Sequence, residues 1–296
     1  EAGYGGQQAS CVAVMSPPLA NASDASVMFS GDFESGDLTG WEVVRDNVPV
    51  VQSTKVRAGG HALKSTLNFF NGAGASALLR ERVEVRAKAP ATVVGKEYWY
   101  GFSIYLPGVA DGADNYVADK YWEIVAQWWA PFDSASECCR NPPLTLQTSA
   151  NGIGGHWYIG GRWSAKANNS NHDYDGTFVK DLGPYETGKW TDWVFRVKWS
   201  YLDDGILEVW KDGKQVLSRI NSPIGYNDLT GPFFKMGLYK GAWELLPEDG
   251  SQLDVVNHRV IYHDEFRMAD EHGSYAAVAP GGEGSAPTPP SALLVN

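Results

Sequence analysis

The segment from Phe233 to Tyr239 alternates apolar and other side chains, and this period-two pattern is typical of a β-strand. One face of the strand would suit a protein core, with Phe234, Met236 and Leu238. The opposite face would carry Lys235, Gly237 and Tyr239. A cation and a phenol separated by glycine suit a flat anionic ligand that lies against a sheet. The alternative is an ordinary solvent-facing strand whose Lys and Tyr side chains extend into water.

Short segments of this kind recur along the chain between turn signals at roughly even spacing. The chain has 33 Gly, 12 Trp and 14 Tyr, which favours strands, turns and surfaces that stack on sugars. Asp212-Gly213 is a strong hairpin signal, and only residues 109–122 suggest a short helix. We therefore predict an all-β fold, a two-sheet antiparallel β-sandwich (jelly roll) with a concave substrate groove. The expected strands are residues 77–85, 98–106, 121–129, 144–149, 156–163, 190–199, 206–211, 233–239 and 260–268.

The 296 residues divide into one domain, residues 29–269, and two flanking segments. Residues 1–28 form a loose leader that looks like a mature N-terminus after processing. Residues 270–296 form a flexible tail rich in Gly and Pro.

Charge and cysteine content limit the classes of function. The net charge of −11 argues against nucleic acid as a partner, although a local cationic cleft could still attract an anionic substrate. The three cysteines, Cys11, Cys138 and Cys139, allow at most one disulfide, and their pairing stays open. No stretch has the length and apolar content of a membrane span. We expect a secreted monomer, extracellular or periplasmic, without an organic cofactor.

Several polar residues are candidates for a sugar site. Gln127 and Trp129 would share a strand face with Glu123 and Val125, which gives an amide to bond a carboxylate or hydroxyl and an indole to stack. A buried Gln satisfied by the backbone is the alternative. Two pairs of cations also recur at period two, either as ligand contacts or as solvated faces: Arg80 with Arg82, and Arg196 with Lys198.

His61 and His156 each follow glycines that let the backbone approach closely, so each could be catalytic or structural. The other four histidines, His263 among them, are assigned to polar turns or the tail. Asp32 and Glu34 near the start and Asp264 near the end could hold a structural Ca²⁺ where the first and last strands meet, with turn chemistry as the alternative.

Motifs of other enzyme classes are missing from the sequence. It contains no Gly-x-Ser-x-Gly elbow, P-loop, Rossmann glycine pattern or His-Glu-x-x-His. No expected strand carries the closely spaced Glu-x-Asp-x-x-Glu arrangement of jelly-roll glucanases, which weakens a glycoside hydrolase interpretation.

Segments in the order of a known family point elsewhere. The run from Phe233 to Tyr239 resembles the Tyr-Phe-Lys-x-Gly-x-Tyr signature of β-jelly-roll polysaccharide lyases. Residues 126–129 and Pro142-Pro143-Leu144 are similar to strands of the glucuronan and heparin lyase branch. Residues 78–81 resemble a strand of alginate lyases, and residues 192–199 and 207–213 complete a pattern that spans roughly residues 30–268.

The resemblance implies cleavage of a (1→4)-uronate linkage by β-elimination, in which C5 loses a proton and O4 leaves. The C5 proton becomes acidic only when the neighbouring carboxylate is neutralised. By resemblance, Gln127 and Arg80 neutralise that carboxylate, and Tyr239 donates a proton to O4. Lys235 and Arg80 would favour the phenolate form that a base needs. Trp129, Arg82, Arg196, Lys198 and His61 are expected to bind the substrate.

Trp129 stands where relatives have a histidine, so either His156 or His61 supplies the base, or Tyr239 moves both protons. One tyrosine acting as base and acid fits syn elimination, which favours glucuronan or mannuronate-rich alginate as the substrate. A carbohydrate-binding module or lectin on the same sandwich remains an alternative, as does a glycoside hydrolase.

Overall fold

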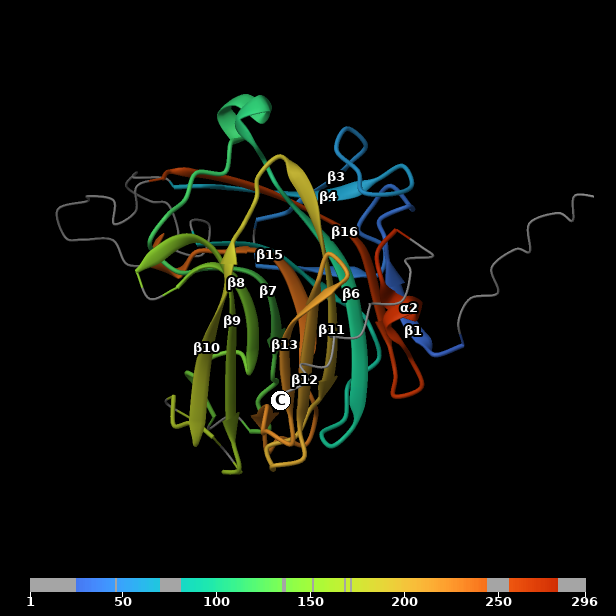
Figure 1. Cartoon of the computed structure of the whole chain (residues 1–296), viewed down its shortest axis with the longest axis vertical. Helices are drawn as coiled ribbons and strands as arrows, with labels where there is room; N and C mark the ends of the chain where they lie inside the picture. Colours follow the sequence, from blue (N-terminus) through green and yellow to red (C-terminus); the bar gives the residue numbers. More distant parts are fainter. Residues whose placement is uncertain are drawn as a thin grey trace, which may run out of the picture.

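The computed structural model of the chain describes residues 25–45, 47–69, 81–134, 137–150, 152–167, 169–170, 172–243 and 256–281. Within these residues two sheets of eight strands pack face to face (Figure 1), which confirms the predicted sandwich. All strand pairs but one are antiparallel.

Sheet A holds strands from both ends of the described chain. Its strands are β1 (Val27–Gly31), β3 (Val50–Gln52), β4 (Ala62–Asn68), β6 (Glu97–Leu106), β11 (Lys189–Lys198), β12 (Ile206–Lys211), β13 (Lys214–Ile220) and β16 (His258–Ala269). They run in the order β13-β12-β11-β6-β16-β4-β3, and β1 pairs with β16. The predicted hairpin joins β12 to β13, and positive φ angles of 49° at Asp212 and 77° at Gly213 suit its tight turn.

Sheet B contains the predicted strand Phe233–Tyr239. Its strands are β2 (Trp41–Val44), β5 (Arg82–Ala87), β7 (Glu123–Trp129), β8 (Leu144–Ala150), β9 (Ile153–Ser164), β10 (Gly176–Pro184), β14 (Gly225–Tyr226) and β15 (Phe233–Tyr239). They run in the order β10-β9-β8-β7-β15-β5-β2, and β14 pairs with β9 in the one parallel contact.

Aromatic rings from both sheets fill the space between them. Phe234 of β15 stacks on Phe266 of β16 with ring centroids 4.4 Å apart. The ring centroids of Trp128 of β7 and Phe195 of β11 are 4.7 Å apart. This apolar layer fixes which side of sheet B faces the core, and the opposite side is called the site face below.

Helices are short in the described residues. The predicted helix at 109–122 is only a 3-10 turn, η1 (Val109–Asp114), and a second turn, η2 (Gly241–Trp243), follows β15. The helix α2 (Tyr275–Val278) lies within the predicted flexible tail, yet Val278 packs against Val194 and Trp210, so the described part of that tail belongs to the folded domain. None of the described helices is long and apolar enough to cross a membrane.

Candidate functional site on sheet B

Strand β15 divides its side chains as the sequence predicts. Phe234, Met236 and Leu238 are in the core, which leaves Lys235, Gly237 and Tyr239 for the site face. Gly237 has φ of 134°, and a Cβ there would collide with the backbone of Val83 on β5. Only glycine therefore fits between the lysine and the tyrosine.

The pairing register places the predicted residues in two rows across the site face. In the first row Tyr239 pairs with Arg82 of β5 on one side and with Ile124 of β7 on the other. The row continues through Gln147 of β8 to Tyr158 of β9. Arg82 also stacks on Tyr239, with its guanidinium carbon 3.7 Å from the ring centroid.

In the second row Lys235 pairs with Arg86 on one side and with Gln127 on the other. Gln127 in turn pairs with Thr145 of β8. The ammonium of Lys235 lies 5.2 Å from the ring centroid of Trp129. The two rows bring Tyr239, Lys235, Gln127, Trp129 and Arg82 to one face.

Glu84 connects the two rows. Its carboxylate is buried, accepts a hydrogen bond from Nε2 of Gln127, and lies 3.1 Å from Nη1 of Arg82 and 3.4 Å from Nζ of Lys235. Gln127 is fully buried, so its amide is held by Glu84 and is not open to solvent. Three residues predicted from the sequence are thus oriented by one carboxylate that the sequence did not single out.

Lys235 is only 4% exposed, so the alternative that its side chain extends into water is wrong. Burial lowers the pKa of Lys235, and the positive charges of Arg82 and Arg45 lower it further, while Glu84 opposes both effects. Its ammonium is a partly compensated buried charge.

Irregular pairing changes the face assignments on β7. Register shifts occur on both sides of Ile124. As a result Val125 belongs to the core and Ile124 lines a pocket on the site face, so the expectation that Val125 shares the face of Gln127 is wrong. Glu123 is buried in an ion pair with Arg259 of β16, so the expectation that it shares the site face with Gln127 is also wrong.

Tyr239 lines a cavity of about 290 Å³, called the tyrosine pocket. Its walls come from β7, β8, β9, β10, the residue before β7 and the loop after it: Trp122, Ile124, Asn141, Pro142, Gln147, Ala150, Arg162 and Val179. Trp122 contacts Tyr239 edge-on, with centroids 5.1 Å apart. The pocket offers a phenol, an amide and a guanidinium around an apolar wall, which suits a sugar.

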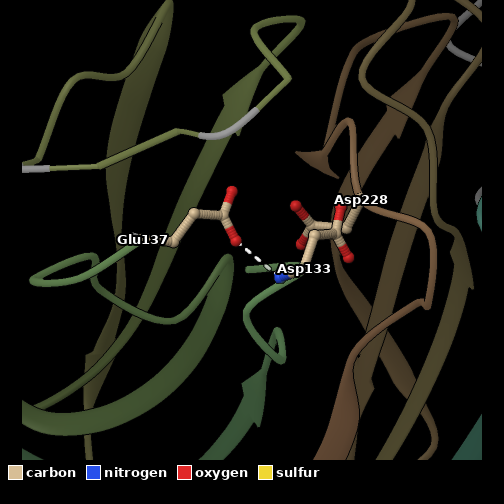
Figure 2. A group of neighbouring side chains, drawn as sticks. All are labelled: Asp133, Glu137 and Asp228. Atoms are coloured by element: carbon tan, nitrogen blue, oxygen red, sulfur yellow. Dashed lines mark hydrogen bonds between the residues drawn. The ribbon is translucent and has the colours of Figure 1, made fainter. Parts of the chain in front are cut away.

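The β7–β8 loop, which supplies Asn141 and Pro142 to that wall, contains two members of a partly buried carboxylate cluster. Figure 2 shows Asp133, Glu137 and Asp228, whose oxygen ligand atoms lie within 4.8 Å of one another. Arg140 binds both oxygens of Asp228 at 2.8 and 2.9 Å and lies 3.7 Å from Glu137. The pKa of Asp228 is raised to about 6, chiefly by burial, with a smaller contribution from the charges of Asp133 and Glu137 and an opposing effect of Arg140.

The end of β15 is fixed by the residue after Tyr239. Lys240 is fully buried, with Nζ 2.9 Å from Asp119 and 3.2 Å from Glu123. Burial alone would raise the pKa of Glu123, but Arg259 and Lys240 outweigh it and hold this pKa below the ordinary value. The ion pairs restrain the backbone that carries Tyr239.

The two histidines proposed as the base, His156 and His61, lie far from Tyr239 in the strand order. His156 lies on β9, where Nδ1 is 2.9 Å from Asp181, and β9 is three strands from β15. Three strand spacings are about 14 Å. His61 precedes β4 of sheet A, and its backbone N–H donates to Glu34.

The predicted cations on β11 do not reach this site either. Arg196 pairs with Glu97 and Glu208, and Lys198 pairs with Asp204, all on or beside sheet A. Their expected convergence with Lys235 is therefore not found. Arg80 lies outside the described residues, as does Cys11, while the sulfurs of Cys138 and Cys139 are 2.9 Å apart.

The carboxylates predicted to bind calcium already accept backbone hydrogen bonds. Glu34 accepts from the N–H groups of Gly60 and His61, and Asp264 accepts from that of Arg57 at 2.7 Å. Asp32 accepts from the N–H of Glu34. Among the described residues these three carboxylates do not form a group like that of Asp133, and calcium binding by them stays a prediction.

A family model described as polysaccharide lyase matches residues 33–267, nearly the whole sandwich. The chain belongs to the polysaccharide lyase family. This lyase resembles solved structures that share its fold. The endo-β-1,4-glucuronan lyase from the fungus Trichoderma reesei superposes with a TM-score of 0.69 at 21% identity, covering 86% of this chain and 99% of that one. A PL-14 alginate lyase from Aplysia kurodai gives 0.54 at 10% identity, covering 83% and 100%. No curated protein sequence matches the chain.

The sequence prediction missed several polar residues of this lyase's site face. Glu84, Gln147, Tyr158 and Arg162 all lie there or line the tyrosine pocket. A period-two signal existed for Glu84, because Arg82, Glu84 and Arg86 alternate with Val83 and Val85. The others become recognisable only when the pairing register is known.

Proposed function

We propose that this polysaccharide lyase cleaves (1→4)-linked uronate chains by β-elimination at Tyr239, with glucuronan or mannuronate-rich alginate as its substrate. The observation that carries the proposal is the placement of Tyr239 at the wall of a sugar-sized pocket, stacked against Arg82 and beside the row of Lys235 and Gln127. The relatives named above act on glucuronan and alginate, which supports this substrate class.

The residues of the site face divide the reaction between them. The resemblance assigns the neutralisation of the substrate carboxylate, which makes the proton on C5 more acidic, to Gln127 and Arg80. Arg80 lies outside the described residues, and Gln127 would exchange its hydrogen bond to Glu84 for one to the substrate. Tyr239 as phenolate would accept that proton, and the same phenol would return it to O4 as the C4–O4 bond breaks. A double bond between C4 and C5 results, and no water is added.

Tyr239 is proposed to move both protons because His156 lies three strands away and pairs with Asp181. A single group requires that the C5 proton and O4 leave from the same side of the ring. Glucuronate and mannuronate have that stereochemistry, which is why they are preferred here to guluronate and galacturonate.

A panel of glucuronan, alginate, heparin and ulvan tests the proposal. We expect an unsaturated product that absorbs in the ultraviolet with glucuronan or mannuronate-rich alginate. Reducing sugar without new absorbance would instead identify a hydrolase, and binding without product would identify a binding module.

Replacing Tyr239 tests its role. Tyr239→Phe should lower the rate of product formation by at least about 100-fold, because a general acid and base is lost while the ring and its stacking remain. The thermal unfolding midpoint of the variant should match that of the parent. Unchanged activity in a folded variant would refute the mechanism.

A further inference from the structure

A second cavity on the site face, of about 350 Å³, shares no lining residue with the tyrosine pocket. It lies over β2, β5, β15 and β7, and is called the cationic pocket. The side chains that the argument uses are Arg45, Arg82, Arg86, Lys235, Trp129 and Phe233.

Two of its four cations are committed to the protein. Arg82 and Lys235 both pair with the buried Glu84. Arg86 is 3.8 Å from Glu42, but both side chains are about half exposed, so this pair is weak. Among the described residues Arg45 has no ion pair at all. Arg45 and Arg86 thus retain positive charge for a ligand, within a chain whose net charge is −11.

The backbone of Arg45 indicates that its position is specified. It follows the last residue of β2 and has φ of 68°, in the left-handed region that non-glycine residues avoid. Such conformations cost free energy and are concentrated at ligand-binding sites. Here the conformation accompanies an exposed guanidinium at the edge of the pocket.

Two aromatic rings form the apolar part of the pocket. The guanidinium of Arg86 stacks on Phe233 with its carbon 3.8 Å from the ring centroid. The ammonium nitrogen of Lys235 likewise lies over the ring of Trp129, 5.2 Å from its centroid. A ring face beside a fixed cation matches a sugar that bears a carboxylate.

The two pockets are displaced along β15. Lys235 in the cationic pocket and Tyr239 in the tyrosine pocket are four residues apart, about 13 Å along the strand. An occupant that reaches both pockets must therefore be an extended chain of several sugars.

We propose that the cationic pocket is a subsite for the carboxylate of a uronate residue away from the cleaved linkage, contacted by Arg45 and Arg86. The inference rests on the proposed lyase function, because it takes the polymer that Tyr239 cleaves as the occupant. It adds a requirement for substrate length that the tyrosine pocket alone does not impose.

Binding in the Tyr239→Phe background tests the subsite without turnover. The dissociation constants of glucuronan oligosaccharides, from disaccharide to octasaccharide, would be measured by calorimetry for this variant and for Arg45→Gln/Arg86→Gln added to it. We expect the added changes to weaken octasaccharide binding by about 10-fold or more and disaccharide binding by less than about 2-fold. Lys211→Gln/Lys214→Gln on the β12–β13 hairpin of sheet A removes the same charge and should change neither constant.

The outcomes separate the subsite from the proposed function. Equal octasaccharide affinity with and without Arg45 and Arg86 overturns the subsite, even where the parent protein forms product from glucuronan. Tighter binding of a sulfated oligosaccharide without uronate overturns the assignment to a carboxylate. No binding of any acidic oligosaccharide overturns the subsite as well. Failure of the parent to form product from the polymer panel refutes the lyase proposal in a separate assay.

Discussion

At the scale of single residues, Glu84 has the widest influence on the candidate site. It contacts Arg82 on its own strand, Lys235 on β15 and Gln127 on β7. Without its negative charge the ammonium of Lys235 would be buried between cations. A buried charge left without its partner is strongly destabilising.

Glu84→Gln should therefore lower the free energy of unfolding by about 3 kcal/mol. Urea denaturation at neutral pH measures this value. Glu42→Gln removes an exposed carboxylate from the neighbouring strand and should cost less than about 1 kcal/mol. Similar losses in the two variants would show that Glu84 does not compensate the buried cations.

The sequence predicted part of this residue-level picture. Period two placed Lys235 and Tyr239 on one face, and the structure confirms it. It could not show that Glu84 pairs with Gln127 and Lys235, because these two residues lie 43 and 151 positions from Glu84 along the chain.

At the scale of elements, β15 depends on a backbone conformation that only glycine supplies. Gly237 interrupts the pairing of β15 with β7 between Met236 and Tyr239 and lies against the backbone of β5. The same irregularity aims Tyr239 at the tyrosine pocket.

Gly237→Ala should destabilise the protein by more than about 2 kcal/mol, since the new Cβ meets backbone that cannot move independently of its sheet. Gly183→Ala is a matched control, because Gly183 in β10 also has positive φ, 86°, but has nothing near its Cβ position. The control should cost about 1–2 kcal/mol, from backbone strain alone. Chemical denaturation of both variants gives the difference, and equal losses would contradict the steric argument.

Strand β7 shows where element prediction fails. Its existence and approximate bounds were predicted, with residues 121–129 expected and Glu123–Trp129 observed. Its faces were partly wrong because register shifts reversed the alternation at its start. A strand's own pattern does not reveal an irregularity that its neighbours impose.

At the scale of the whole molecule, a histidine between the sheets links stability to pH. His263 of β16 is fully buried, and its Nε2 donates to the carbonyl oxygen of Val125 on β7. The sequence assigned it to a polar turn, which is wrong. Burial lowers its pKa to about 4. The unfolded chain, with a histidine pKa near 6.5, therefore binds more protons than the folded protein between these values.

The contribution of His263 to stability is present above pH 6.5 and is lost as pH falls toward 4. The loss should be on the order of 3 kcal/mol. Asp264 acts in the opposite direction, because burial raises its pKa to about 7 and stability rises as its carboxylate gains a proton.

The difference in unfolding free energy between the parent and His263→Gln isolates this effect from that of Asp264. As pH falls from 7 to 4, we expect the parent to lose stability relative to the His263→Gln variant. Urea denaturation at several pH values measures the two free energies of unfolding. A difference that does not depend on pH would refute the assignment.

The sequence by itself determined the fold class, the division of β15 into a core face and a site face, and the order of segments that resembles polysaccharide lyases. These features depend on local alternation and turn chemistry, which act over a few residues. Only the tertiary structure decided that Arg82, Gln127 and Trp129 join Tyr239 and Lys235, whereas Arg196 and Lys198 belong to the other sheet. Strand order and register are set by packing between segments far apart in the chain, so neither can be derived from the pattern of one strand.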